Sequence, residues 1–188
     1  DASLRFLAEK HAKPFFLTVS YDSPHEICGW RKHTPDWQPA SLADCPALPE
    51  NFAVPANEAS VLREIYMNRH PEQKELDPES WRKYRWAYYR YIERVDGYIG
   101  QLLDALETGG LAQNTLVIFS SDHGDGLGAH QWLGKCCHYD EVVRVPFIMS
   151  YPGQIAPGQV DETRLISSGL DFYATVLDYA GIATPPAC

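Results

Sequence analysis

A single long helical pattern between Asp77 and Gly110 constrains the fold more than any other part of the sequence. Asp77 and Pro78 form a typical start signal, because an acidic N-cap and a proline at the first position suit a helix N-terminus. Gly109 and Gly110 supply the end signal. Between them, apolar side chains recur at intervals of three and four residues: Trp81, Tyr84, Tyr88, Tyr91, Ile92, Val95, Ile99, Leu102, Leu103 and Leu106. A helix of this length with one apolar stripe needs a large surface to pack against, and a sheet is the natural partner.

Three apolar runs rich in β-branched and aromatic residues predict strands at residues 15–20, 115–120 and 145–151. Continuous apolar runs of this length suit strands that are buried on both faces, as in a parallel sheet covered by helices. Two shorter helices are predicted at residues 1–13 and 168–180, the second of them with a serine cap. This order of elements indicates an α/β fold.

Residues 24–71 are rich in proline and show little periodicity, so they are interpreted as one long irregular loop. Loops of this length in a compact domain tend to be functional or mobile.

The composition excludes several classes of protein. The 188 residues suffice for one domain with a hydrophobic core, and the net charge is −9, from 16 basic and 25 acidic side chains. Such a charge argues against nonspecific nucleic-acid binding, and no apolar run approaches the roughly 20 residues of a membrane span. Five cysteines without CxxC spacing indicate neither a disulfide framework nor a zinc site. Because the chain starts at Asp1 without a signal-peptide pattern, we expect it to begin within a longer gene product.

Polar side chains that suit a metal and an anion follow two of the predicted strands. His25 lies shortly after the first, while Asp122 and His123 directly follow the second and precede Lys135. Carboxyl ends of strands are where sites form in open α/β sheets. A carboxylate and an imidazole on adjacent residues can reach one cation if Gly124 lets the backbone bend tightly. An ammonium fixed near that cation would suit an anionic ester.

Plainer interpretations stand beside this one. Asp122 could cap an Asx turn with His123 at the surface, and only the following Lys135 favours a site over that alternative. A single histidine in a loop, such as His25 or His130, is usually a solvated or capping side chain. The basic residues of the long helix are interpreted as its solvated face and its aromatic residues as core, and the Cys136–Cys137 pair as accidental.

At these residues the sequence resembles the sulfatase family, the arylsulfatase-like enzymes of the alkaline phosphatase superfamily. The resemblance is carried by NTLVIFSSDHGDGLGAHQWLGK, YDEVVRVPFIMSYPG, KPFFLTVSYDSPHE and SSGLDFYATVLDYAGI, between Lys13 and Ile182. It implies an α/β fold with a mixed, mostly parallel sheet sandwiched by helices. Residues 1–188 would then be part of a catalytic domain, from the centre of its core to the C-terminal side.

The resemblance also implies roles for individual residues. Asp122 and His123 would ligate a divalent cation, calcium in most of the family, although an imidazole ligand by itself suggests a transition metal. Lys135 would contact the sulfate and neutralise charge that develops on its oxygens. His25 would contact the sulfate or protonate the leaving alcohol, and His130 would have a weaker role in substrate binding.

One departure from the family pattern is serious. The family nucleophile is a formylglycine made from the Cys or Ser of a Cys/Ser-x-Pro-Ser-Arg motif, and neither this motif nor the paired N-terminal aspartate ligands occur in these 188 residues. We therefore expect a fragment that does not turn over substrate by itself.

The intact protein is expected to hydrolyse sulfate esters of a sugar, a glycan or an aryl alcohol. A phosphodiester or phosphonate monoester hydrolase of the same superfamily and a non-catalytic binding remnant remain as alternatives. A periplasmic or secreted location is the family expectation.

Overall fold

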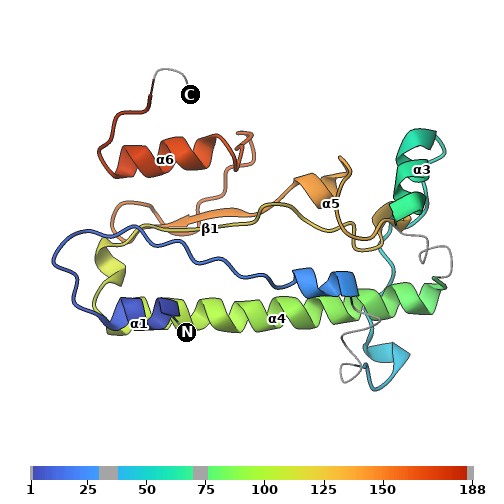
Figure 1. The fold of residues 1–188 in the computed structure, drawn as a ribbon, viewed down its shortest axis with the longest axis horizontal. Coiled ribbons are helices and arrows are strands. Elements are labelled where there is room, and N and C mark those ends of the chain that lie inside the picture. The colour runs from blue at the N-terminus through green and yellow to red at the C-terminus, as the bar shows by residue number, and fades with distance from the viewer. Residues whose placement is uncertain (1, 30–37, 70–75, 186–188) are drawn as a thin grey trace.

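The computed structural model describes residues 2–29, 38–69 and 76–185 of the chain. The helices in these residues are α1 (Ala2–Ala8), α3 (Ser60–Arg69), α4 (Pro78–Thr108), α5 (Asp140–Val143) and α6 (Asp171–Tyr179). The strands are β1 (Val117–Ser120) and β2 (Phe147–Ser150), and short 3-10 turns lie at His25–Gly29, Leu42–Asp44, Ala112–Asn114 and Ala129–Gln131. In Figure 1, α4 runs the length of the molecule beneath the two strands, and α6 lies on their other side.

The long helix α4 forms where the sequence predicts it. The Asp77 carboxylate caps its start by accepting the backbone N–H of Ser80 at 2.7 Å, and Pro78 is its first residue. The helix ends at Thr108, and the chain leaves it through Gly110, whose φ of +69° is a conformation that glycine adopts without strain. Local capping and the apolar stripe therefore determine both ends of this helix.

The sheet of the described residues consists of β1 and β2, which pair in antiparallel orientation with Phe119 opposite Ile148. The third predicted strand, residues 15–20, is extended but pairs with no strand in the part of the chain that is described. It runs beside α4 instead, where the ring of Tyr21 stacks on Tyr98 at 5.7 Å between centroids (Figure 1). An extended segment becomes a strand only when a neighbour satisfies its backbone hydrogen bonds.

Burial of the strands also differs from expectation. Side chains alternate along β2, and Ile148 is 58% exposed although both faces were predicted to be covered. Phe119, its cross-strand neighbour, is exposed as well.

The hydrophobic core lies at the other end of the molecule, on the first half of α4. It joins that half of the helix to the 3-10 turn His25–Gly29 and to residues 132–142, and consists of Ile27, Trp81, Tyr84, Ala87, Tyr91, Trp132, Leu133, Cys137 and Val142. The interpretation of the aromatic stripe as core is confirmed for its N-terminal half.

The described part of the proline-rich segment is more ordered than predicted, while residues 30–37 and 70–71 of this predicted loop lie outside the described residues. It contains α3. The helix α4 also binds its backbone, because Arg82 donates hydrogen bonds to the carbonyl oxygens of Leu42, Cys45 and Pro46. Arg85 in the same way donates to the Leu127 carbonyl at 2.7 Å. The interpretation of these two arginines as a solvated face is wrong, because both bind backbone carbonyls that water would otherwise have to satisfy.

The two short predicted helices are both shorter than expected. α1 ends at Ala8, and α6 begins at Asp171, after an N-cap at Leu170 that makes no side-chain capping bond. None of the described helices is both long and apolar enough to span a membrane.

Candidate functional site

The loop that follows β1 is folded so tightly that two of its positions accept only glycine. Backbone N–H groups of Gly124 and Gly126 donate at 2.8 Å to the carbonyls of Val142 and Gly134. A Cβ atom at Gly124 would lie 2.0 Å from the Glu141 carbonyl oxygen, and one at Gly126 would lie 2.6 Å from that of Trp132. The glycines are therefore needed for close approach of two backbones. The tight turn that the sequence predicts after Asp122–His123 is confirmed.

His123 lies at the start of this loop with a defined pattern of hydrogen bonds. Its Nδ1 is 2.8 Å from the Gly124 carbonyl oxygen, which can only accept, so Nδ1 carries the proton. The Nε2 atom of the neutral ring is then an acceptor, and the Lys135 ammonium donates to it at 2.8 Å. The loop thus brings together two residues that are distant in sequence and that the sequence assigned to one site.

Asp122 completes this group, which we call the Asp-His-Lys cluster. Its Oδ2 atom lies 3.3 Å from His123 Nε2, and its side chain is 82% exposed. Burial acts to raise the pKa of Asp122, but the hydrogen bonds from the His123 backbone N–H at 3.0 Å and from the Ser121 hydroxyl outweigh it, so the pKa is lowered. The Asp122 Oδ2 and His123 Nε2 atoms are therefore neighbouring lone-pair acceptors, and the second of them also receives Lys135.

This donor set fits a divalent cation. A carboxylate oxygen and a neutral imidazole nitrogen that converge with no proton between them are a usual pair of metal ligands. No group of three or more His, Cys, Asp or Glu side chains in the described ranges could hold a metal ion by itself. The cluster therefore offers part of a coordination shell.

The Cys28 thiol of the 3-10 turn His25–Gly29 lies within electrostatic range of Lys135. Burial raises the pKa of the Cys28 thiol in this turn, Asp125 raises it further, and the Lys135 ammonium lowers it. Ile27 anchors the turn in the same core as Leu133. The turn that carries His25 thus shares a core with Leu133, two residues before Lys135; the His25 residue is exposed, and its role stays a prediction.

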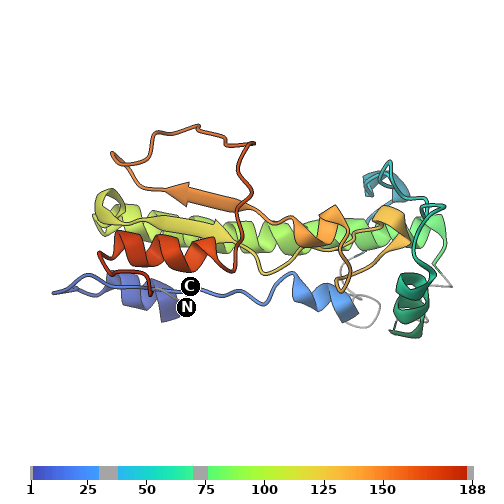
Figure 2. The ribbon, with the colours of Figure 1, turned by 90° about the horizontal axis from the view of Figure 1, so that it is seen from above.

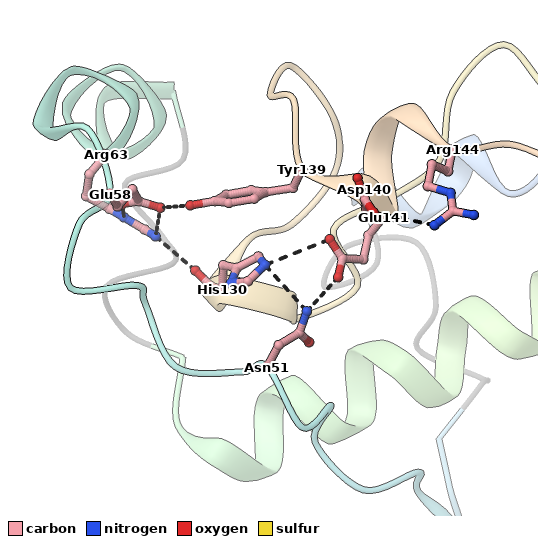
Figure 3. Close-up of polar contacts among 8 residues, drawn as sticks. All are labelled: Asn51, Glu58, Arg63, His130, Tyr139, Asp140, Glu141 and Arg144. Carbon is pink, nitrogen blue, oxygen red and sulfur yellow. Dashed lines mark hydrogen bonds and ion pairs between the residues drawn. The ribbon is translucent and has the colours of Figure 1, made fainter. Parts of the chain in front are cut away.

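His130 belongs to a different group, which Figure 3 shows. Its ring stacks on Tyr139 with centroids 4.1 Å apart, and its Nε2 lies 3.4 Å from the Asn51 amide nitrogen and 4.0 Å from Glu141 Oε2. The Asn51 amide also donates to Glu141 Oε1 at 2.6 Å. These contacts join the proline-rich segment to both ends of the loop that contains Lys135. A role of His130 in substrate binding stays a prediction.

Glu58 and Arg63 extend the same network (Figure 3). Arg63 donates two hydrogen bonds of 2.7 Å to the Glu58 carboxylate and one of 2.9 Å to the His130 carbonyl. Burial raises the pKa of Glu58, but the bonds from Arg63 and from the Tyr139 hydroxyl lower it by more. For Tyr139, burial and the bond to Glu58 raise the pKa to about 12. No pattern in the sequence indicates this network, because its partners come from a segment interpreted as irregular.

Asp125 is the other functional candidate that sequence reasoning missed, although it stands in the Asp-His-Gly-Asp-Gly motif. It accepts the hydroxyl hydrogen of Tyr84, which reaches it from α4 at 3.0 Å. Burial of the Tyr84 side chain, together with this carboxylate, raises the pKa of Tyr84 well above its ordinary value. The signal that could have identified Asp125 is Tyr84, since a tyrosine in an apolar stripe needs a hydrogen-bond partner for its hydroxyl when it is buried.

Known proteins share both the sequence and this architecture. The chain is 31% identical over 195 residues to the Delta 4,5-hexuronate-2-O-sulfatase of Bacteroides thetaiotaomicron, covering 98% of this chain and 40% of that protein. It is 28% identical over 200 residues to the multifunctional alkaline phosphatase superfamily protein PehA of Trinickia caryophylli, covering 100% of this chain and 38% of that protein.

Structural comparison agrees with the sequence. The crystal structure of a Bacteroides thetaiotaomicron protein assigned to the sulfatases superimposes with a TM-score of 0.87 at 29% identity, over 98% of this chain and 41% of that one. The chain thus spans about 40% of the length of each of these three relatives. This neighbour has the α/β fold of the alkaline phosphatase superfamily, which agrees with the predicted fold class. The Sulfatase family model matches residues 1–182, and the chain belongs to the sulfatase family.

Proposed function

We propose that the protein containing these residues is a sulfuric ester hydrolase, and that the Asp-His-Lys cluster is the metal-and-lysine part of its active site. One observation carries the proposal: Lys135 Nζ and Asp122 Oδ2 lie 2.8 and 3.3 Å from the same atom, His123 Nε2, in the loop after β1. Residues 1–188 would form the part of the catalytic domain that positions these groups.

In this proposal each residue of the cluster has a separate task. Lys135 holds a positive charge where negative charge develops on the sulfuryl oxygens. Asp122 and His123 hold a divalent metal, for which we propose Ca²⁺, and this metal withdraws electron density from the ester oxygens when bound. Since Nε2 of His123 has one lone pair, it serves either the ammonium or the metal. Metal binding would therefore release Lys135 Nζ toward the substrate.

His25 is proposed to contact the sulfate or to protonate the leaving alcohol, because Ile27 of its turn shares a core with Leu133, two residues before Lys135. His130 is proposed as a weaker substrate contact. The family implies a formylglycine nucleophile. The Cys/Ser-x-Pro-Ser-Arg motif that carries it would have to come from residues other than these 188.

The proposed substrates are sulfated sugars or glycans. One relative that covers nearly all of this chain is by name a sulfatase of a 2-O-sulfated hexuronate. An enzyme for such polymers meets them outside the cytoplasm, so we also propose a periplasmic or secreted location. Phosphodiester or phosphonate monoester hydrolysis is the second candidate, favoured by the similarity to a multifunctional member of the superfamily.

The test uses the full-length protein with aryl sulfate, a 2-O-sulfated disaccharide and an aryl phosphodiester as substrates. We expect kcat/KM to be highest for a sulfate ester. A higher value for the phosphodiester would transfer the assignment to the second candidate. No turnover of any of these esters by metal-loaded protein would support a binding remnant and reject the enzyme.

The same assay tests the cluster. Lys135→Ala should raise the activation free energy by about 2–4 kcal/mol, as for loss of a charge-stabilising group. Asp122→Ala should abolish metal-dependent turnover and lower the bound metal content. Lys83→Ala is the matched control, because Lys83 lies on α4 in a single ion pair with Glu79. A loss below tenfold in Lys135→Ala would remove Lys135 from the proposed site.

A further inference from the structure

The carboxylate of Asp125 binds three donors that come from three separate parts of the chain. It accepts the Tyr84 hydroxyl of α4 at 3.0 Å and the Leu127 backbone N–H at 2.7 Å. It also accepts the backbone N–H of Gly134, the residue directly before Lys135. One side chain therefore ties the two ends of the loop 127–134 to each other and to the long helix.

The backbone before Lys135 is held from two directions. The Gly134 N–H is bound by Asp125, and the Gly134 carbonyl accepts the Gly126 N–H at 2.8 Å. Gly134 itself has a φ of +69°, and no atom lies within 4 Å of the place where its Cβ would be. This residue has no side chain that could pack, and its backbone conformation is an uncommon one. We therefore infer that its two hydrogen bonds hold its backbone in place.

The position of Lys135 Nζ depends on this backbone. A lysine side chain has four rotatable bonds and holds its ammonium in place only where its own backbone is fixed and a partner receives it. Trp132 Nε1 donates to the Lys135 carbonyl at 3.1 Å, which fixes the far side of the same residue. The carboxylate of Asp125 supplies the remaining restraint, on the side that faces α4.

We propose that Asp125 is the positioning residue of Lys135: it fixes the Gly134–Lys135 backbone so that the ammonium reaches the ester oxygens. This proposal rests on the proposed function, because it assumes that Lys135 acts on the ester. Asp125 acts only through Lys135. Misplacing a reacting or stabilising group by about 1 Å can reduce a rate about 100-fold.

The experiment is a double-mutant cycle in the full-length protein with Asp125→Asn and Lys135→Ala. An asparagine at position 125 keeps the size of the side chain but cannot accept three donors with one carbonyl oxygen. We expect Asp125→Asn to lower kcat about 100-fold with KM changed less than about threefold, since the lost contact acts in the transition state. In the Lys135→Ala background the same change should lower kcat by less than about threefold.

The substrate is an aryl sulfate with a good leaving group, so that residual rates of the double variant stay measurable. The matched control is Asp161→Asn, because Asp161 also accepts backbone N–H groups in a turn, those of Thr163 and Arg164. This control should leave kcat and KM unchanged. Equal losses from Asp125→Asn in both backgrounds, or a loss below threefold in the wild type, would overturn the proposal.

A second variant keeps the test decisive if Asp125→Asn lowers stability. Asp125→Leu combined with Tyr84→Phe replaces both partners of the buried Tyr84–Asp125 hydrogen bond by apolar groups, which can be nearly neutral for stability. The positioning role predicts that this variant regains the thermal midpoint while kcat stays low. Recovery of kcat together with the midpoint would show that Asp125 only stabilises the fold. Absence of sulfate turnover in the wild type would reject the proposed function and leave Asp125 with no role in it.

Discussion

The two halves of α4 lie in different surroundings. Of the five buried side chains of the helix, Trp81, Tyr84, Ala87 and Tyr91 belong to its first half and to the core with the loop after β1, and only Leu106 lies in the second half. The second half lies under β1, β2 and α6, and α6 contributes no buried residue. Figure 2 shows the same division from above, with the strands and α6 over one end of the helix.

This difference shows where the chain can hold a site without further help. Polar groups are positioned accurately only when packed side chains fix the backbone that carries them. We call the first half of α4 and the core packed on it the first region, and the second half with β1, β2 and α6 the second region. In the first region, Trp132 and Leu133 are buried and lie just before Lys135. In the second region, large apolar side chains such as Ile148 and Leu165 remain exposed. The Asp-His-Lys cluster accordingly begins just after β1, where the chain passes from the second region into the first.

The largest effect that separates the two regions is expected from core truncation. Trp132→Ala should lower the free energy of unfolding by about 3–5 kcal/mol, because the residue is 2% exposed and its removal leaves a cavity. Leu165→Ala, in a residue that is 99% exposed, should change it by less than about 0.5 kcal/mol. Urea unfolding of the 188-residue chain measures both. Similar losses from the two variants would contradict the division of the molecule into these regions.

A somewhat smaller loss is expected from a single methyl group in the loop. Gly124→Ala should cost about 3 kcal/mol, since its Cβ would overlap the Glu141 carbonyl oxygen and force two backbones apart. The matched control is Gly97→Ala in α4, where no atom lies within 4 Å of the added Cβ. This control should raise stability by up to about 1 kcal/mol, as alanine favours helices. A neutral result for Gly124→Ala would mean that the loop is looser than described.

The smallest expected effect concerns pH and the network in Figure 3. The pKa of Glu58 is lower in the folded protein than its ordinary value of 4.5, so its contribution is present above that pH and is lost as pH falls through the folded pKa. Glu58→Gln should therefore cost about 1 kcal/mol at pH 7 and make stability less dependent on pH below 4.5.

Unfolding curves at pH 7 and at pH values below 4.5 check this expectation. Glu64→Gln, an exposed change on the same helix α3, serves as the control and should alter neither the stability nor its pH dependence. An unchanged pH profile in Glu58→Gln would exclude Glu58 as a source of acid sensitivity.

The sequence predicted those parts of the fold that depend on neighbours in the chain. Asp77 and Gly110 mark the limits of α4, because caps and turns act within a few residues. Asp122, His123 and Lys135 were assigned to one site from the glycines between them and from the family resemblance, and the structure places Asp122 and Lys135 each in contact with His123.

The remaining features depend on pairings between distant segments. Asn51 meets Glu141 across 90 residues, and Arg63 meets the His130 carbonyl across 67. The extended residues 15–20 show the converse case, since a strand-like composition does not supply a neighbouring strand. Local patterns contain no information about partners at such separations, so these contacts could not be predicted from the residues alone.

The apolar stripe of α4 also has a consequence for synthesis of the protein. Tyr84 precedes its partner Asp125 by 41 residues, and ribosomes add roughly 5–20 residues per second, so the interval between them is roughly 2–8 s. During that time the nascent helix has its aromatic side chains made but not the loop that will cover them. The emerging chain therefore offers chaperones an apolar helix surface that the finished first region hides.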